Sequence, residues 1–169
     1  MHRGARAHRA GLTVPGPQGP IPAVDDVPMS FSYPVAVKFS EIDLAGVVFN
    51  SHYLTWCEDA KMAFLDDVGY GPYRFAAEHR LALVRHAEID WTASLKPLDH
   101  ADIRVVVERI GTSSFTLRHE IWRRGEAPLL TATCVITYVW FDTVAGAKAP
   151  LDPDFREALH RVQAPAGQG

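Results

Sequence analysis

Cysteine is scarce in this chain, and long apolar runs are missing. The 169 residues include only Cys57 and Cys134, too few for a disulfide framework, and neither has a Cys or His at metal-ligand spacing. No uncharged apolar stretch approaches the ~18 residues that a membrane helix needs. The basic start, MHRGARAHRAG, is not followed by the apolar segment of a secretory signal. We therefore expect a cytoplasmic protein with no metal, no cofactor and no membrane partner.

An excess of positive charge is also missing. The formal net charge is −3, and the aromatic residues sit among apolar residues instead of alternating with Lys and Arg. Proteins that bind nucleic acid usually combine a basic patch with aromatic side chains on which bases stack. We therefore expect no nucleic-acid partner.

The length favours one domain, but the first residues do not resemble part of it. Residues 1–30 are rich in Gly, Pro, Ala and Arg. They carry too few large apolar groups to offset the entropy lost on ordering. We expect residues 1–30 to be a disordered N-terminal arm, residues 31–163 to be the folded domain, and residues 164–169 to be a flexible tail.

Hydrophobic spacing predicts one strand followed by a long helix. Residues 33–39 alternate as in a strand. From Ser51 onward, large or apolar residues recur at spacings of three and four, which predicts a helix with a broad apolar face. Asn50 or Ser51 can cap its start, and Gly69 can end it in a left-handed conformation. Gly71 and Pro72 then prevent easy continuation.

The remainder of the chain predicts mainly strands. After a mixed segment at 75–80, the expected strands are 81–93, 102–110, 115–123 and 129–141, separated by turn-forming residues. The run TCVITYVWF is apolar nearly throughout and predicts a central, covered strand. A short last helix can begin with Asp152 as its cap and Pro153 in its first turn.

Together these elements predict an α+β domain in which an antiparallel sheet wraps around one helix. A single sheet over one helix leaves strand edges unpaired, so we expect a dimer that pairs two sheets.

Residues 39–65, FSEIDLAGVVFNSHYLTWCEDAKMAFL, resemble the signature of the 4-hydroxybenzoyl-CoA thioesterase-like branch of the hotdog superfamily. That signature has an Asp, a small-residue stretch with Gly, a short apolar run, and a Tyr early in a long helix. Here these are Asp43, Ala45-Gly46, Val47-Val48 and Tyr53. The resemblance covers roughly residues 33–160. It implies a hotdog fold, a homodimer or homotetramer with active sites at subunit interfaces, and thioester hydrolysis.

The resemblance assigns the chemistry to Asp43 and to the start of the helix. A carboxylate can attack the thioester carbonyl directly or act as general base for water. By resemblance, the backbone N–H near Asn50 polarises that carbonyl, and Gly46 lets backbone and substrate approach closely. Glu58 is a second carboxylate that serves as base in one alternative and forms a structural hydrogen bond to loop backbone in the other.

The substrate is expected to lie beside the first turns of the helix. The candidate binding residues are Gly46, Val47, Val48, His52, Tyr53 and Trp56. Three of them also have a simpler interpretation: Tyr53 and Trp56 as core residues, and His52 as a helix-surface residue. Asn50 as an N-cap and Asp43 as a turn-forming residue are the corresponding alternatives for the two catalytic candidates.

The thioester is expected to be an acyl-CoA with an aromatic or fatty acyl group. A carrier-protein thioester remains an alternative, because the turn GTSS lacks the basic cluster that some aromatic acyl-CoA members carry there. Residues available to bind the CoA phosphates are Lys96, Arg104, Arg109, Arg118, Arg123 and Arg124. Two further alternatives are a hotdog dehydratase, whose His-containing motif we do not find, and a non-catalytic acyl-binding or dimerisation module.

Overall fold

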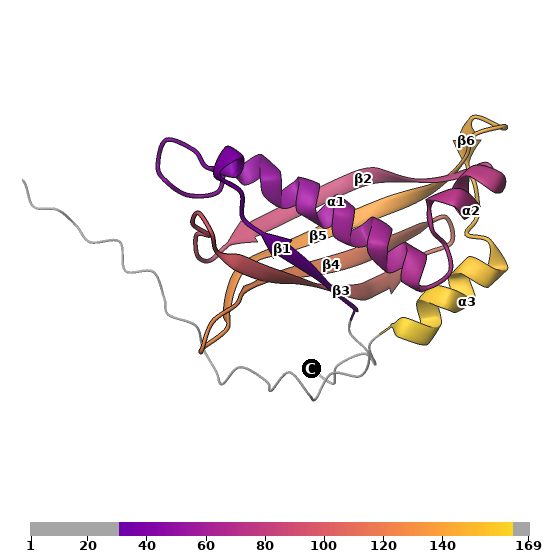
Figure 1. The fold of residues 1–169 in the computed structure, drawn as a ribbon. Helices are drawn as coiled ribbons and strands as arrows, with labels where there is room; N and C mark the ends of the chain where they lie inside the picture. The colour runs from indigo at the N-terminus through magenta and orange to yellow at the C-terminus, as the bar shows by residue number, and fades with distance from the viewer. Residues whose placement is uncertain (1–30, 164–169) are drawn as a thin grey trace, which may run out of the picture.

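In the computed structural model, which describes residues 31–163, one long helix lies across a curved antiparallel sheet (Figure 1). The helix is α1 (Asn50–Asp67). The sheet has the strand order β1 (Phe31–Ala36), β3 (His100–Ile110), β4 (Ser114–Arg123), β5 (Leu129–Asp142), β2 (Arg80–Trp91), and β6 (Ala147–Lys148) also pairs with β5. All pairings are antiparallel. The predicted α+β class and the wrapping of the sheet around the helix are therefore confirmed.

The core lies between α1 and the sheet face that it covers. Alternate residues of each inner strand point into it, as the period of a strand requires. In β5 these are Ala132, Cys134, Ile136, Tyr138 and Trp140, all with 0% exposure. The intervening Thr133, Val135, Thr137 and Val139 are half-buried. The run TCVITYVWF is thus central, as predicted, but only its helix-facing side is fully covered within one chain.

The ends of α1 correct one prediction and confirm another. The helix begins at Asn50, and its N-cap is Phe49, without a side-chain hydrogen bond. Neither Asn50 nor Ser51 is the cap, because Phe49 is held in extended backbone by the hydrogen bond that its N–H donates to the carbonyl of Glu41. Gly69 has φ +84°, so the helix ends in the left-handed conformation that glycine favours.

Three shorter elements differ from the predictions. The first strand ends at Ala36, and residues Phe39–Glu41 form a 3-10 turn, η1. A helix that was not predicted, α2 (Pro72–Ala77), extends into the mixed segment, because Pro72 begins a new helix at its first position and does not merely end the previous one. The strand β6 was not predicted. The last helix, α3 (Pro153–Val162), starts after Asp152 as predicted.

The cap of α3 works differently from the prediction. The carboxylate of Asp152 makes no side-chain cap hydrogen bond. It accepts hydrogen bonds from Arg80 Nε (3.2 Å) and Trp140 Nε1 (2.9 Å) instead. Arg80 Nη1 also donates to Asp142 at 2.5 Å. Asp152 therefore fastens the start of α3 to β2 and β5, at the end of the sheet opposite the start of α1 (Figure 1).

The expected arm at residues 1–30 and tail at residues 164–169 lie outside the described residues. Within residues 31–163, no helix combines the length and apolar character needed to span a membrane.

Candidate active site

Asp43 sits in a tight turn that orients its carboxylate. Its N–H donates to the carbonyl of Val47 (2.9 Å), and the Gly46 N–H donates to the carbonyl of Asp43 (3.0 Å). Gly46 has φ +76°, which explains why a glycine is needed at this position. Oδ1 of Asp43 accepts hydrogen bonds from the N–H groups of Ala45 (2.7 Å) and Val47 (3.4 Å). The side chain is half-buried, so a ligand can still reach it.

A second carboxylate fixes this turn to the helix. Glu41, 8% exposed, accepts hydrogen bonds from Lys38 N–H (2.8 Å) and Trp56 Nε1 (3.1 Å). Its backbone carbonyl accepts a hydrogen bond from the N–H of Phe49, directly before α1. Trp56 is therefore a buried support for the Asp43 loop. Sequence reasoning missed Glu41, because nothing in the local pattern shows that a carboxylate will be buried.

The start of α1 supplies backbone donors near the carboxylate. The first N–H groups of a helix have no intrahelical acceptor, and the helix dipole adds partial positive charge there. Because no side chain caps α1, the N–H groups at its first residues, Asn50 and Ser51, are not claimed by a capping side chain. This end of the helix can accommodate developing negative charge.

Asp43 and Asn50 line one cavity of about 320 Å³. Val47, Val48 and Tyr53 also line it, as do Trp91 at the end of β2 and the following residues Thr92, Ala93 and Ser94. The backbone of Leu95 bonds to two of these lining residues: the Val48 N–H donates to the Leu95 carbonyl (3.0 Å), and the Leu95 N–H donates to the Tyr53 hydroxyl (3.4 Å). Burial raises the pKa of Tyr53, so this phenol stays neutral.

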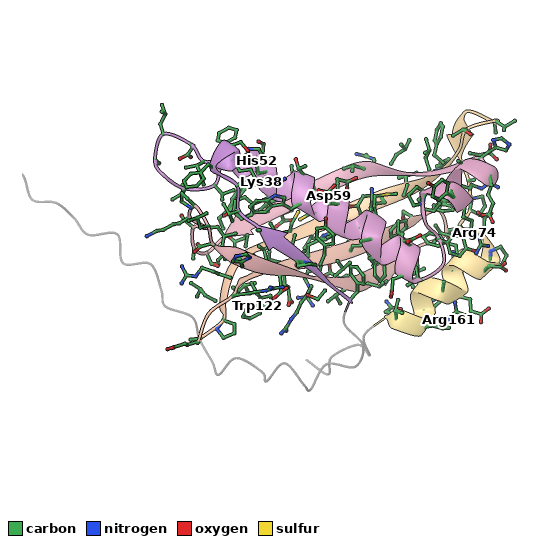
Figure 2. The ribbon with its side chains drawn as sticks, in the orientation of Figure 1. Lys38, His52, Asp59, Arg74, Trp122 and Arg161 are labelled. Carbon is green, nitrogen blue, oxygen red and sulfur yellow. The ribbon has the colours of Figure 1, made fainter. Side chains whose placement is uncertain are left out.

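Four of the candidate residues lie outside the cavity lining: Gly46, His52, Trp56 and Glu58. Gly46 shapes the turn, and Trp56 supports Glu41. His52 is half-buried at the start of α1, where Figure 2 labels it. Trp56 (5% exposed) is a core residue, whereas Tyr53 (2% exposed) both belongs to the core and lines the cavity.

Glu58 is engaged between α1 and β5. Its Oε1 accepts a hydrogen bond from the Tyr138 hydroxyl (2.7 Å), and its Oε2 accepts one from Lys61 Nζ (2.5 Å). Burial and the charge of Glu58 raise the pKa of Tyr138, which therefore remains a donor. The expected structural role thus involves two side chains and not loop backbone. A role for Glu58 as base stays a prediction.

The residues from Trp91 to Ser94 were not anticipated as site residues. They follow Asp43 by almost fifty positions, and no local motif marks them. Only the packing of the end of β2 against the helix start reveals them. Within residues 31–163, no group of three or more His, Cys, Asp or Glu is placed to hold a metal ion.

Several of the candidate CoA-binding cations already have partners. Arg104 lies over the Trp122 ring (5.2 Å to its centroid), Arg118 pairs with Glu120, and Arg124 pairs with Asp102. These residues lie on or beside β3 and β4. Lys96 directly follows Leu95, whose backbone bonds to the cavity residues Val48 and Tyr53.

Comparison with known proteins agrees with this geometry. Residues 37–159 match the model of the Thioesterase-like superfamily. The chain therefore belongs to this family, and the sheet around its central helix is the hotdog fold that the sequence predicted.

Three relatives illustrate the similarity. A 1,4-dihydroxy-2-naphthoyl-CoA hydrolase of Nostoc punctiforme is 27% identical over 127 residues, covering 75% of this chain and 83% of the relative. A solved gentisyl-coenzyme A thioesterase is 26% identical, with TM-score 0.69 over 76% of this chain and 98% of the other. A solved 4-hydroxybenzoyl CoA thioesterase, 16% identical, has TM-score 0.72 over 77% of this chain and 98% of the other, which shows the shared fold alone.

Proposed function

We propose that this protein is a thioesterase that hydrolyses an acyl-CoA to the free acid and the CoA thiol. The observation that carries the proposal is the shared cavity of Asp43 and Asn50. The carboxylate of Asp43 and the N-terminal end of α1 both border this cavity. Membership of the Thioesterase-like superfamily supports the reaction class, and the names of the relatives support a CoA thioester.

In the proposed mechanism, the thioester carbonyl lies between Asp43 and the start of α1. Asp43 either attacks the carbonyl carbon, forming a mixed anhydride that water then cleaves, or removes a proton from the attacking water. In both routes the C–S bond breaks and the CoA thiolate leaves, to be protonated to the thiol. The N–H at Asn50 stabilises the negative oxygen, and such a donor lowers the barrier by roughly 3 kcal/mol.

The cavity favours an aromatic acyl group over a long alkyl chain. Its volume of about 320 Å³ is at the small end for ligand sites. Tyr53 and Trp91 meet in it edge to face, with ring centroids 6.2 Å apart. Aromatic edges and faces pack well against a further ring. The named substrates of two relatives, 1,4-dihydroxy-2-naphthoyl-CoA and gentisyl-CoA, are consistent with this preference.

The working unit is proposed to be a homodimer or a homotetramer in the cytoplasm. Trp91 lines the cavity and is 46% exposed in the single chain, so a second subunit can cover it.

A panel of thioesters tests the function. Aromatic, short, medium and long acyl-CoAs, and the preferred acyl group on a carrier protein, are each followed by release of free thiol. Turnover of an aromatic acyl-CoA is the expected result. Faster turnover on the carrier protein would show that the substrate is a carrier-protein thioester and not an acyl-CoA. Acyl-CoA binding without thiol release from any substrate would show that the protein is a non-catalytic acyl-binding module and not an enzyme.

A further inference from the structure

Two loops that lie side by side at the end of the molecule where α1 starts carry exposed apolar side chains. They are residues 37–49, before α1, and residues 92–99, between β2 and β3 (Figure 1). The Val37 N–H donates to the Asp99 carbonyl (2.9 Å) and so joins them. Four of their large apolar side chains are exposed: Phe39 (71%), Leu44 (109%), Phe49 (50%) and Leu98 (69%). We call these four residues the apolar rim.

Leu98 is held in a backbone conformation that a bulky side chain disfavours. Its φ is +69°, in the left-handed region where glycine is favoured. The turn begins at Lys96, continues with Pro97, and is closed by the hydrogen bond from the Asp99 N–H to the Lys96 carbonyl (3.1 Å). A leucine at this position costs conformational strain and also leaves an apolar side chain in water. Since neither cost benefits the single chain, a contact outside the chain explains the residue better.

The exposed charged side chains of the two loops are both cations. Lys38 and Lys96 are exposed, and neither forms an ion pair with another residue of the described range 31–163. The carboxylates are less exposed, since Glu41 is buried and Asp43 and Asp99 are half-buried. Each of these carboxylates accepts a hydrogen bond from a backbone N–H of its own loop. The exposed charge beside the apolar rim is therefore positive, and it complements an anionic surface.

We propose that the apolar rim, together with Lys38 and Lys96, docks on the surface of an anionic lipid bilayer. Phe and Leu side chains next to Lys are typical of protein surfaces that lie in the lipid–water interface. Surfaces that bind proteins are instead enriched in Tyr, Trp and Arg, and Lys is depleted there. The sequence led us to expect no membrane partner because no segment can span a bilayer, but a contact at the bilayer surface needs no such segment.

The same two loops supply much of the lining of the Asp43 cavity. Val47 and Val48 belong to the first loop, and Thr92 and Ser94 belong to the second. Docking of the apolar rim would therefore bring the proposed active site next to the bilayer, where an apolar acyl group partitions. That consequence rests on the proposed function, whereas the lipid contact itself does not.

Co-sedimentation of the full chain with lipid vesicles tests the contact without any assumption about thioester hydrolysis. Vesicles of an equimolar mixture of phosphatidylcholine and phosphatidylglycerol should bind wild type, and vesicles of phosphatidylcholine alone should bind it more weakly. The double variant Lys38→Glu/Lys96→Glu should lose this preference, and added salt should weaken the binding of wild type to the anionic vesicles. Wild type that stays in the supernatant with both kinds of vesicle overturns the proposal.

Leu98→Gly separates docking from folding. Glycine adopts a φ of +69° without strain, so the melting temperature from circular dichroism should not fall. The partition coefficient onto the anionic vesicles should nevertheless decrease about tenfold, because an apolar side chain is removed from the contact. The control Tyr73→Ser changes a side chain that is 92% exposed on α2, at the other end of α1, and should bind as wild type does. Equal binding of wild type and Leu98→Gly overturns the proposal, and a clear loss of stability would show that Leu98 serves the fold instead.

Light scattering tests the alternative that a second copy of the chain covers the apolar rim. The double variant Leu44→Ser/Leu98→Gly should keep the molar mass of wild type while it loses vesicle binding. A smaller assembly would assign the apolar rim to a subunit interface and overturn the lipid contact. If wild type releases no thiol from any thioester, the proposed function fails, while the vesicle experiment still decides whether the apolar rim binds lipid.

Discussion

The hydroxyl of Tyr138 donates a 2.7 Å hydrogen bond to Oε1 of Glu58 and so joins β5 to the middle of α1. Lys61 completes the connection, since its Nζ lies 2.5 Å from Oε2 of Glu58 and 4.7 Å from the centroid of the Tyr138 ring. The Lys61 side chain is only 5% exposed, whereas that of Glu58 is 39% exposed. The carboxylate thus neutralises a buried ammonium group while keeping contact with solvent.

This arrangement predicts that Glu58 matters for stability more than for chemistry. Glu58→Gln keeps an acceptor for Tyr138 but leaves Lys61 without a counter-charge. Removing one partner of a buried pair costs about 3–5 kcal/mol, and the partial exposure of Glu58 reduces this to about 2 kcal/mol. Melting temperature, from circular dichroism, should fall by several degrees. Turnover of the preferred thioester at a temperature where the variant is folded should stay within about threefold of wild type.

The buried His119 makes stability depend on pH. Its side chain has 0% exposure, and burial lowers its pKa to about 4, partly offset by the Cys134 carbonyl. As pH falls from ~6.5 toward 4, the unfolded chain binds a proton on this residue but the folded protein does not. The free energy of unfolding should therefore decline over this range, by about 3 kcal/mol from His119 alone.

Urea unfolding at several pH values checks this prediction in wild type and in His119→Leu. Carboxylates titrate in both proteins, so the difference between the two curves isolates His119. The stability of wild type relative to the variant should decrease between pH 6.5 and 4. Parallel curves would show that His119 is protonated equally in both states.

Local signals in the sequence predicted the frame of the molecule. The apolar spacing from Tyr53 to Val68 defined α1 to within a few residues, and Gly69 marked its end. Alternation and turn residues located the four long strands. These features could be predicted because periodicity and turn preference depend on neighbours in the chain. The short elements α2 and β6 were not predicted, because a helix or strand of a few residues has no measurable hydrophobic period.

The candidate site was predictable only in part. Asp43, Val47, Val48, Asn50 and Tyr53 belong to one continuous motif, and the structure places all five in the cavity. Trp91 joins them through strand pairing, which local sequence does not reveal. Likewise, Glu58 gives no sign in the sequence that Tyr138, 80 residues later, is its partner. The part of the cavity lining that comes from β2 could be identified only from the three-dimensional fold.

The turn that holds Asp43 depends on the positive φ of Gly46. A Cβ added at this glycine meets no atom within 4 Å, so the cost of Gly46→Ala is conformational strain alone. We expect a loss of about 1–2 kcal/mol in the free energy of unfolding and reduced turnover, because the strained turn displaces Asp43. The control Gly125→Ala, in a turn without a positive φ, should leave both quantities unchanged. Equal effects of the two substitutions, in urea unfolding and thiol release, would contradict this account.

Asp43→Asn is the most direct test of the proposed chemistry. Asparagine keeps a side-chain oxygen that can accept the hydrogen bond from Ala45 N–H, but it removes the anion that attacks the carbonyl or activates water. Turnover should fall by at least about a hundredfold, equivalent to roughly 2.7 kcal/mol of barrier. KM should change much less, because the carboxylate acts mainly in the transition state. Melting temperature should barely change, since the turn keeps its hydrogen bonds.

Two control substitutions make the Asp43 result specific, because each removes one carboxylate charge on α1, away from the Asp43 turn. Asp59→Asn changes an exposed residue in the middle of the helix (Figure 2) and should leave turnover unchanged. Glu58→Gln changes the carboxylate bound by Tyr138 and should cost far less turnover than Asp43→Asn. If instead Asp43→Asn retains wild-type turnover and Glu58→Gln abolishes it in the folded protein, the helix carboxylate is the catalyst. If both variants remain active, neither carboxylate performs the reaction, and the shared cavity of Asp43 and Asn50 binds substrate without supplying the base.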